Sequence, residues 1–245
     1  LMKIALIGHG AMGKLIERLA VEKGHEIAVV VDDSDAGLSV DEFAAKLASA
    51  DVAIDFTVAE AVRRNVEACV AAGVPLVEGT TGWNASRDEI EKIVREGNGA
   101  FVYGANFSIG VNLFYRIVAQ ASELIAKFPE YEAFIEERHH SRKKDAPSGT
   151  ALKLQDIVQN MLGEDADKSV RVQVSSTRAG NIPGTHTVGF DGPADQITLT
   201  HTARSREGFA TGAILAAEWI AGKTGFYEFS EIIKELVNQK KINHR

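Results

Sequence analysis

The fold of this chain is most constrained by a regular alternation of apolar runs and amphipathic stretches through its first hundred residues. Runs typical of buried strands lie at residues 3–7, 26–31, 52–56, 75–77 and 100–102. Stretches with the helical period of about 3.6 residues lie between them, at residues 12–22, 40–47, 59–72 and 86–95. Because strands that alternate with helices are joined by right-handed crossovers, the pattern predicts an α/β domain with a parallel sheet.

The pattern changes after residue 107 and becomes richer in strands. Helices are expected at residues 111–126 and 151–161, and strands at residues 131–138, 170–176, 185–190 and 196–202. Residues 163–168 are interpreted as a polar turn. Residues 209–221 form the last expected helix, which returns to the first domain. We therefore predict one domain from residues 1–107 and 208–245, and a second α+β domain with an antiparallel or mixed sheet from residues 108–207.

A glycine-rich turn follows the first predicted strand and opens the first predicted helix. Its residues are Gly8, His9, Gly10, Ala11, Met12 and Gly13. Glycines in this context allow a tight turn and a close approach of backbone N–H groups to a pyrophosphate at a helix N-terminus. Asp32 and Asp33 end the second strand about 20 residues later, where an acid that binds ribose belongs. The pattern indicates a Rossmann domain that binds a dinucleotide, with His9 and Met12 as local contacts.

Two further loops follow strands of the same predicted sheet, at the edge where ligands bind in such folds. One contains Gly79, Thr80 and Thr81, and the other contains Gly104, Ala105, Asn106 and Phe107. Small and hydroxyl-bearing residues suit a loop that lies against a nicotinamide ring. Taken singly, each loop is equally well explained as an ordinary glycine-rich turn.

Charge and cysteine content argue against several classes of function. The chain has 27 basic and 34 acidic residues, a net charge of −7, whereas proteins that neutralise nucleic-acid phosphates are normally basic. No apolar run approaches the roughly 18 residues of a membrane span. The single cysteine, Cys69, excludes an intrachain disulfide framework and is expected to be a buried, inert thiol. We expect a cytoplasmic protein that binds neither nucleic acid nor membrane.

A basic segment interrupts this acidic chain. Residues 138–144 carry four fixed positive charges and the imidazoles of His139 and His140. Ser148, Gly149 and Thr150 then open a helix, whose N-terminus suits a carboxylate or phosphate. The combination predicts a small acidic substrate, although a solvated loop with a structural histidine pair is the simpler alternative.

A zinc site is a weaker interpretation of the two histidines. Adjacent histidines are poorly placed to bind one ion, and no further Cys, His or Glu grouping stands out near them. His186 and His201 lie in strand patterns and are interpreted as structural, while His25 and His244 are expected at the surface.

Taken together, these motifs resemble the 4-hydroxy-tetrahydrodipicolinate reductase (dihydrodipicolinate reductase) family of the lysine and diaminopimelate pathway, over nearly the whole chain. The resemblance rests on residues 8–13, 55–57, 79–82, 105–112, 137–150 and 201–210. Its most specific part is the run His-His-x-x-Lys-x-Asp-Ala-Pro-Ser-Gly-Thr from His139 to Thr150. It implies a Rossmann domain for NAD(P)H and an α+β domain that binds a cyclic dicarboxylate and forms a homotetramer.

The resemblance also implies roles for individual residues. His139 matches the family's proton donor and acceptor, and Lys143 its second catalytic proton donor. The positions that match substrate contacts are His140, Ser148, Gly149 and Thr150. The positions that match cofactor contacts are Gly8, His9, Gly10, Ala11, Met12, Gly13, Asp32, Gly79, Thr80, Thr81, Gly104, Ala105, Asn106 and Phe107. No metal is implied.

Two departures from the family pattern bear on the cofactor. Ala11 stands where many members have an arginine, and Asp33 stands where some members have an arginine that meets the 2′-phosphate of NADP. We therefore expect NADH to be favoured over NADPH, with Lys14 as a partial compensation. Two other functions remain open at this stage. One is a different two-domain dehydrogenase of an amino-acid-like acid, and the other is a non-catalytic NAD-dependent sensor or nucleic-acid-binding module.

Overall fold

The computed structural model describes residues 1–162 and 171–239. The chain divides into two compact units, Leu1–Ile109 with Glu207–Arg245 and Gly110–Arg206. The polar turn expected at residues 163–168, the first residue of the strand expected at 170–176, and His244 lie outside the described residues.

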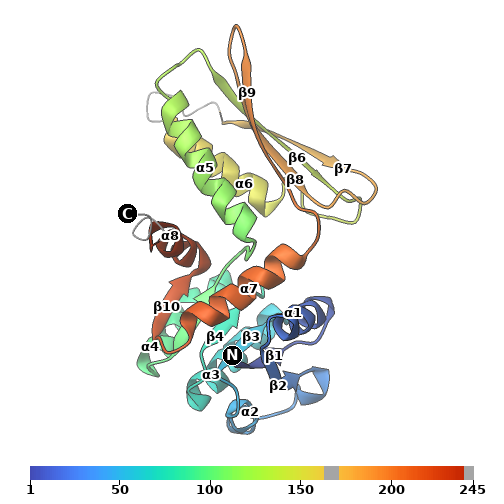
Figure 1. The fold of residues 1–245 in the computed structure, drawn as a ribbon, viewed down its shortest axis with the longest axis vertical. Helices are drawn as coiled ribbons and strands as arrows, with labels where there is room; N and C mark the ends of the chain where they lie inside the picture. The colour runs from blue at the N-terminus through green and yellow to red at the C-terminus, as the bar shows by residue number, and fades with distance from the viewer. Residues whose placement is uncertain (163–170, 240–245) are drawn as a thin grey trace. The chain divides into compact units, whose positions relative to one another are not determined.

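The first unit is built on a six-stranded sheet in which every pairing is parallel, as the alternating pattern predicts (Figure 1). In spatial order its strands are β10 (Gly225–Glu228), β5 (Ala100–Tyr103), β4 (Leu76–Glu78), β3 (Val52–Asp55), β1 (Lys3–Ile7) and β2 (Glu26–Val31). The chain passes from β1 to β2 on one side and to β3 on the other. The loops after β1 and β3 therefore meet at the switch point where such sheets bind ligands.

Helices cover both faces of this sheet. One face carries α1 (Ala11–Glu22), α7 (Glu207–Ile220) and α8 (Phe229–Gln239), and the other carries α2 (Val40–Leu47), α3 (Ala59–Ala72) and α4 (Arg87–Glu96). Successive side chains of β1 show the division, because Ile4 and Leu6 join the first core whereas Ala5 and Ile7 join the second. A strand buried on both faces is continuously apolar, which explains why β1 lacks an alternating pattern.

The first unit contains two elements after the helix that was expected to be the last one. The helix predicted as the last one is α7, and β10 and α8 follow it. The four residues of β10 are all only half-buried at the sheet edge, so they give no clear strand pattern. Phe229, Ile232 and Ile233, which are buried in α8, do have the spacing typical of a helix.

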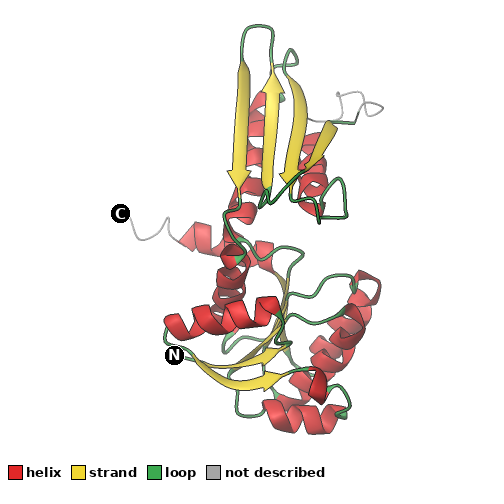
Figure 2. Cartoon of the chain, turned by 90° about the vertical axis from the view of Figure 1, so that its right-hand side faces the viewer, coloured by secondary structure: helices red, strands yellow, loops and turns green. Residues whose placement is uncertain are grey.

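The second unit pairs a mixed four-stranded sheet with two helices on one face (Figure 2). Its strands in spatial order are β7 (Gln173–Arg178), β6 (Glu132–His139), β8 (Thr185–Asp191) and β9 (Gln196–Thr202). Strand β7 runs parallel to β6, and the other pairings are antiparallel. Helices α5 (Ile109–Ile125) and α6 (Gly149–Met161) bury the core of this unit against the sheet.

Two polar features of the first unit bear on the sequence-based expectations. Cys69 is buried in α3, and burial raises the pKa of its thiol, which agrees with an inert cysteine. The His25 side chain, expected at the surface, is only 8% exposed. Its ring contacts the backbone N–H of Met2 and lies 3.1 Å from the carboxylate of Glu218, which draws it inward. None of the described helices combines the length and apolar character that a membrane crossing requires.

Candidate active site

The turn between β1 and α1 has the shape of a phosphate cradle. Gly8 has φ +89°, a conformation that favours glycine, and a Cβ atom at Gly13 would collide with the carbonyl oxygen of Gly8. At Gly10, by contrast, no atom lies within 4 Å of where a Cβ would stand. Gly10 also begins α1 without a side-chain cap, so the first N–H groups of the helix face this open space. The geometry fits the pyrophosphate of a dinucleotide.

The other side chains of the turn have local contacts. His9 Nε2 lies 2.6 Å from Oε2 of Glu17, and Met12 packs against the core. Ala11 is exposed at the first position of α1. The backbone around Gly10 is thus the part of the turn best placed to meet phosphates, with His9 and Ala11 at its rim.

Asp32 lies just beyond β2, exposed to solvent. Its Oδ1 accepts hydrogen bonds from the hydroxyl and the backbone N–H of Ser34, at 2.6 and 2.9 Å, and these bonds lower the pKa of Asp32. The nearby cations are engaged elsewhere, because Lys46 pairs with Asp35 at 2.6 Å and Arg64 donates to the carbonyl of Ala36. The end of β2 therefore presents negative charge to a ligand.

The loop after β4 is anchored by Thr80. Its hydroxyl accepts from the backbone N–H of Thr57 at 2.9 Å, its own N–H donates to Glu78 at 2.7 Å, and its carbonyl accepts from the indole of Trp83. Thr80 is buried, whereas Gly79 is half-buried and Thr81 exposed. Gly79 and Thr81 are thus the members of this loop with surface to offer a cofactor.

Beneath this loop, Asp55 and Glu78 form a buried carboxyl pair. The two residues are register partners on β3 and β4, both are fully buried, and their side chains hydrogen-bond to each other. Burial raises the pKa of both groups, and the charge of Asp55 raises that of Glu78 further. Asn65 donates to Asp55 at 2.7 Å, which favours the ionised form there. A hydrogen bond between two carboxyl groups needs a proton, which this arrangement places on Glu78.

The loop after β5 divides between core and surface. The Phe107 side chain is buried and its ring packs 4.8 Å from that of Phe229, so Phe107 belongs to the core. Asn106 accepts a hydrogen bond from the backbone N–H of Ser108 at 2.8 Å. Gly104 lies against Phe229 and Phe107, and Ala105 is exposed. A cofactor contact from Phe107 would come through its backbone.

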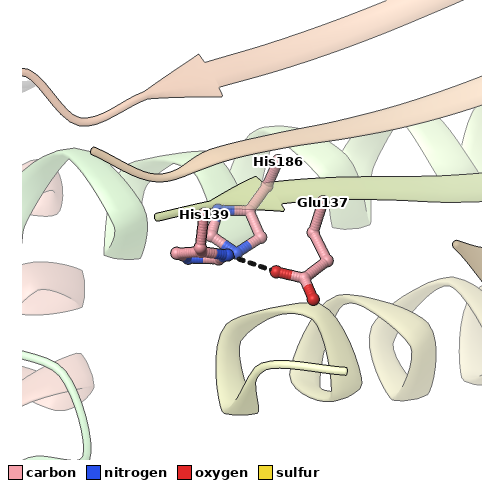
Figure 3. Close-up of side chains that lie close together, drawn as sticks. All are labelled: Glu137, His139 and His186. Carbon is pink, nitrogen blue, oxygen red and sulfur yellow. Dashed lines mark ion pairs between the residues drawn. The ribbon is translucent and has the colours of Figure 1, made fainter. Parts of the chain in front are cut away.

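In the second unit, His139 lies at the end of β6 in a cluster with Glu137 and His186 (Figure 3). The alternation of β6 places Glu137 and His139 on the helix-covered face with Ile135, and Glu137 is the register partner of His186 on β8. Nδ1 of His139 lies in close contact with Oε2 of Glu137, and the two imidazole rings lie edge to face at 5.0 Å. One ligand atom of each residue lies within 4.8 Å of the others, a spacing that can hold a metal ion.

Arg178 and Ser148 complete this cluster. Arg178, at the end of β7, donates to Oε1 of Glu137 at 2.6 Å and to the carbonyl of Asp145. The backbone N–H of Ser148 donates to the same Glu137 oxygen at 3.3 Å, and its hydroxyl lies 3.1 Å from Nε2 of His186. Glu137 is therefore held by partners from several parts of the second unit.

These neighbours set the protonation of the cluster. Burial lowers the pKa of His139, and Lys143 and Arg178 lower it further against the opposing effect of Glu137. Burial works to raise the pKa of Glu137, but hydrogen bonds from Arg178 and Ser176 outweigh it, and the pKa is lowered. Burial lowers the pKa of His186 to about 4. At neutral pH the cluster therefore holds an ionised glutamate beside two neutral imidazoles.

The predicted catalytic loop continues from this cluster. Lys143 pairs with Asp145 at 2.8 Å, its side chain is 26% exposed, and its backbone N–H donates to the carbonyl of His140. His140 is half-buried. The loop thus presents an ammonium group close enough to His139 to affect its pKa.

Helix α6 begins where this loop ends. Ser148 caps it by accepting from the N–H of Ala151 at 3.2 Å, and the Ser148 side chain is buried. Gly149 is exposed with open space around it. Thr150 hydrogen-bonds to Tyr115. The hydroxyl of Ser148 is thus engaged within the protein, and the helix end around Gly149 is the part that can meet an anion.

Sequence reasoning gave no role to Glu137 or Arg178 and interpreted His186 as structural. The expectation that no further grouping lies near His139 is wrong, since the structure brings Glu137 and His186 to it. The two-residue spacing of Glu137 and His139 on a strand was a usable signal. Arg178 and His186 come from distant strands, and only the register of the sheet brings them together.

The parallel sheet with its glycine-rich phosphate cradle, followed by a second unit with a histidine and lysine cluster, defines a two-domain nicotinamide-dependent oxidoreductase. Family models described as dihydrodipicolinate reductase N-terminus and C-terminus match residues 2–107 and 110–233. The chain belongs to the dihydrodipicolinate reductase family.

Curated relatives agree with this assignment. A 4-hydroxy-tetrahydrodipicolinate reductase of Christiangramia forsetii is 38% identical over 96% of this chain and 99% of its own length. The enzyme of the same name from Archaeoglobus fulgidus is 38% identical over 95% of this chain and 100% of its own. The activity of the family is the NAD(P)H-dependent reduction of 4-hydroxy-tetrahydrodipicolinate in lysine and diaminopimelate biosynthesis.

Solved structures show the same fold. The dipicolinate-bound dihydrodipicolinate reductase of Paenisporosarcina sp. TG-14 aligns with a TM-score of 0.76 at 22% identity, over 95% of this chain and 99% of that one. A putative myo-inositol dehydrogenase of Sinorhizobium meliloti aligns at 0.55 with 14% identity, over 87% and 85% of the two chains. The higher TM-score is thus with a member of the reductase family.

Proposed function

We propose that this chain reduces 4-hydroxy-tetrahydrodipicolinate with NADH as its preferred cofactor, using His139 and Lys143, as a cytoplasmic homotetramer. The observation that carries the proposal is one short run of chain, from His139 to Thr150. It brings a neutral imidazole, an ammonium group and a helix N-terminus together within the second unit. A cytoplasmic location is supported by the lone, buried thiol of Cys69.

The residues that would hold the cofactor are those of the β1–α1 turn, with Gly79, Thr81 and the loop after β5 on the nicotinamide side. When bound, the reduced nicotinamide supplies the hydride. Asp32 and Asp33 at the end of β2 favour NADH, because ribose hydroxyls can donate to carboxylates whereas a 2′-phosphate would meet two like charges. Lys46 and Arg64 already have partners, which leaves Lys14 to offset that repulsion.

The residues that would bind the substrate carboxylates are Gly149 and Thr150 at the start of α6, with His140. A carboxylate at a helix N-terminus meets N–H donors and the positive end of the helix dipole. The bound dipicolinate named for the Paenisporosarcina relative supports a small cyclic dicarboxylate. Ser148, predicted to contact the substrate, would serve by capping α6, since its hydroxyl is engaged with Ala151 and His186.

His139 and Lys143 would act on the reacting part of the substrate. A neutral imidazole can accept a proton at Nε2 and return it, and the lowered pKa of His139 keeps it neutral at working pH. The partly exposed ammonium of Lys143 can neutralise negative charge that develops on the substrate, or donate a proton.

The proposal is tested by following NADH oxidation at 340 nm with freshly generated 4-hydroxy-tetrahydrodipicolinate. We expect substrate-dependent oxidation with NADH, and a kcat/KM for NADPH no higher than that for NADH at the same ionic strength. A folded protein that oxidises neither cofactor when this substrate is added would overturn the proposed function. A tenfold preference for NADPH would overturn the assignment of the cofactor while leaving the reaction in place.

A further inference from the structure

The Glu137 carboxylate is the most completely enclosed charge in the His139 cluster. Its side chain has no exposed surface, and its two oxygens have different partners. Oε1 accepts from Arg178 at 2.6 Å and from the backbone of Ser148, while Oε2 faces Nδ1 of His139. A buried charge without partners is costly, so a carboxylate held in this way has a defined structural or chemical task.

Neighbouring strands fix the position of Glu137. It shares one face of β6 with His139, it is the register partner of His186 on β8, and it lies opposite Ser176 on β7. Arg178 is in turn the register partner of His139. The contact between Glu137 and His139 is thus set by strand geometry within one sheet, where a side chain has little freedom to turn away.

The contact determines which ring nitrogen of His139 carries the proton. An ionised carboxylate can lie against Nδ1 only when that nitrogen bears hydrogen, and in a neutral imidazole Nε2 is then the basic atom. Gly184 lies next to Nε2, where a Cβ atom would stand only 3.3 Å from both Nε2 and Cδ2 and would crowd the ring. The ring therefore has one nitrogen engaged by Glu137 and the other on the side where Gly184 adds no side chain.

We propose that Glu137 is a positioning residue, whose carboxylate keeps the proton of His139 on Nδ1 so that Nε2 faces the reacting substrate. Arg178 keeps Glu137 ionised and in place. The inference rests on the proposed function, because it takes His139 as the group that exchanges a proton with the substrate. It extends the site to residues outside the His139–Thr150 run.

Glu137, His139 and His186 could instead hold a metal ion. The positioning role is favoured because Arg178 already donates to Glu137, and a cation bound there would face that guanidinium. Nε2 of His186 is also engaged with the Ser148 hydroxyl. The experiments must therefore distinguish metal binding from the positioning role of Glu137.

The first test needs no turnover. In a long-range ¹H–¹⁵N spectrum of protein labelled in its histidines, the His139 signals are assigned by their loss in His139→Gln. We expect wild-type protein at pH 7.5 to show His139 protonated on Nδ1. Protonation on Nε2 would overturn the inference, whatever the catalytic activity. Failure of the proposed function would be seen separately, as absence of NADH oxidation by the same wild-type sample.

The second test compares Glu137→Gln with Glu136→Gln. Glu136 is the exposed neighbour on the opposite face of β6, so it controls for the loss of one carboxylate. Positioned proton transfer is worth about 10²- to 10⁴-fold, so a Glu137→Gln variant that loses the correct tautomer should have a kcat at least about tenfold lower, with NADH affinity unchanged. Glu136→Gln should keep wild-type kcat.

The pH profile gives a readout that a purely structural role would not move. The charged and titratable groups around His139 are Glu137 on β6, Arg178 on β7, His186 on β8 and Lys143 in the following loop. Glu137 raises the pKa of His139, so its removal should shift the acid limb of kcat/KM to lower pH. An unshifted limb with kcat within threefold of wild type would overturn the inference. Loss of wild-type activity on chelation, restored by Zn²⁺, would replace it with the metal site.

Discussion

At the scale of single residues, Lys143 differs from the neighbouring cations of its loop. Its ammonium pairs with Asp145 at 2.8 Å and its charge acts on His139, whereas Lys144 is an exposed side chain. If the basic loop were only a solvated surface, replacing Lys143 or Lys144 would have the same small effect on activity. The distinction between them gives a matched pair of variants.

Replacement of His139 or Lys143 should lower kcat far more than it weakens NADH binding. Positioned proton transfer contributes about 10²- to 10⁴-fold, so His139→Gln should fall in that range. Lys143→Ala should cost at least as much, because it also removes a charge that meets the developing anion. Lys144→Ala is the control and should keep near-normal kcat. Steady-state kinetics, NADH titrations and thermal midpoints measure these effects. A folded Lys143→Ala protein whose kcat lies within threefold of the wild-type value would remove Lys143 from the mechanism.

The preference for NADH should respond to one side chain at the end of β2. Asp33→Arg replaces a repulsive charge with one that can pair with a 2′-phosphate, and a change of about 1.4 kcal/mol shifts the ratio of kcat/KM values tenfold. We expect the NADPH to NADH ratio to rise by about that factor or more. An unchanged ratio, measured for both proteins at one ionic strength, would show that Asp33 does not face the ribose end of the cofactor.

At the scale of elements, the parallel sheet could be predicted from the sequence because its signals are local. The glycine turn, the apolar run of β1 and the acid at the end of β2 follow one another within about thirty residues. The cluster around Glu137 could not be predicted in full, because it depends on the register of β6 with β7 and β8. Thr80 and Phe107 show a related limit, since the sequence placed them in cofactor loops but could not tell that their side chains face inward.

The buried carboxyl pair of Asp55 on β3 and Glu78 on β4 predicts an unusual dependence of stability on pH. The folded chain raises the pKa of Glu78, so the protonated side chain contributes its full stability below the ordinary pKa of glutamic acid, about 4.3. That contribution is lost as the pH rises toward the higher pKa of the folded state. Glu78→Gln imitates the protonated form at every pH, since its amide can donate to Asp55 and its oxygen can accept from Thr80.

We therefore expect the thermal midpoint of Glu78→Gln to rise relative to that of wild type as the pH is raised from 5 to 8. Calorimetry across this range measures the difference directly. Glu96→Gln, on a side chain that is 69% exposed, is the control and should track wild type. Parallel curves for Glu78→Gln and wild type would show that the Asp55–Glu78 pair does not retain its proton in the fold.

At the scale of the whole molecule, we assign the interface of the proposed tetramer to the open face of the second sheet. The apolar alternation of Val174 and Leu199 fits either a contact face or a core, and both side chains pack toward the core of their own unit. The face away from α5 and α6 instead presents threonines, with Thr187 and Thr200 joined by a 3.0 Å hydrogen bond. A polar sheet face of this kind can pack against its own copy in a closed, symmetric oligomer.

Light scattering at micromolar concentration should give a mass about four times the 26.4 kDa of one chain. Thr200→Arg places a charge on the open sheet face and should lower that mass without loss of secondary structure. A wild-type mass near 26 kDa would contradict the tetramer. A tetramer that survives Thr200→Arg would place the interface on another surface.

The proposed reaction is the transfer of hydride from a reduced nicotinamide to a cyclic dicarboxylate. Isotope transfer tests it most directly, with NADH that carries deuterium at both C4 positions and freshly generated 4-hydroxy-tetrahydrodipicolinate. We expect the tetrahydrodipicolinate product to gain one deuterium per turnover, seen in its mass spectrum as an increase of one mass unit over product made with unlabelled NADH. A product that carries no deuterium from the cofactor, or no product at all, would contradict it.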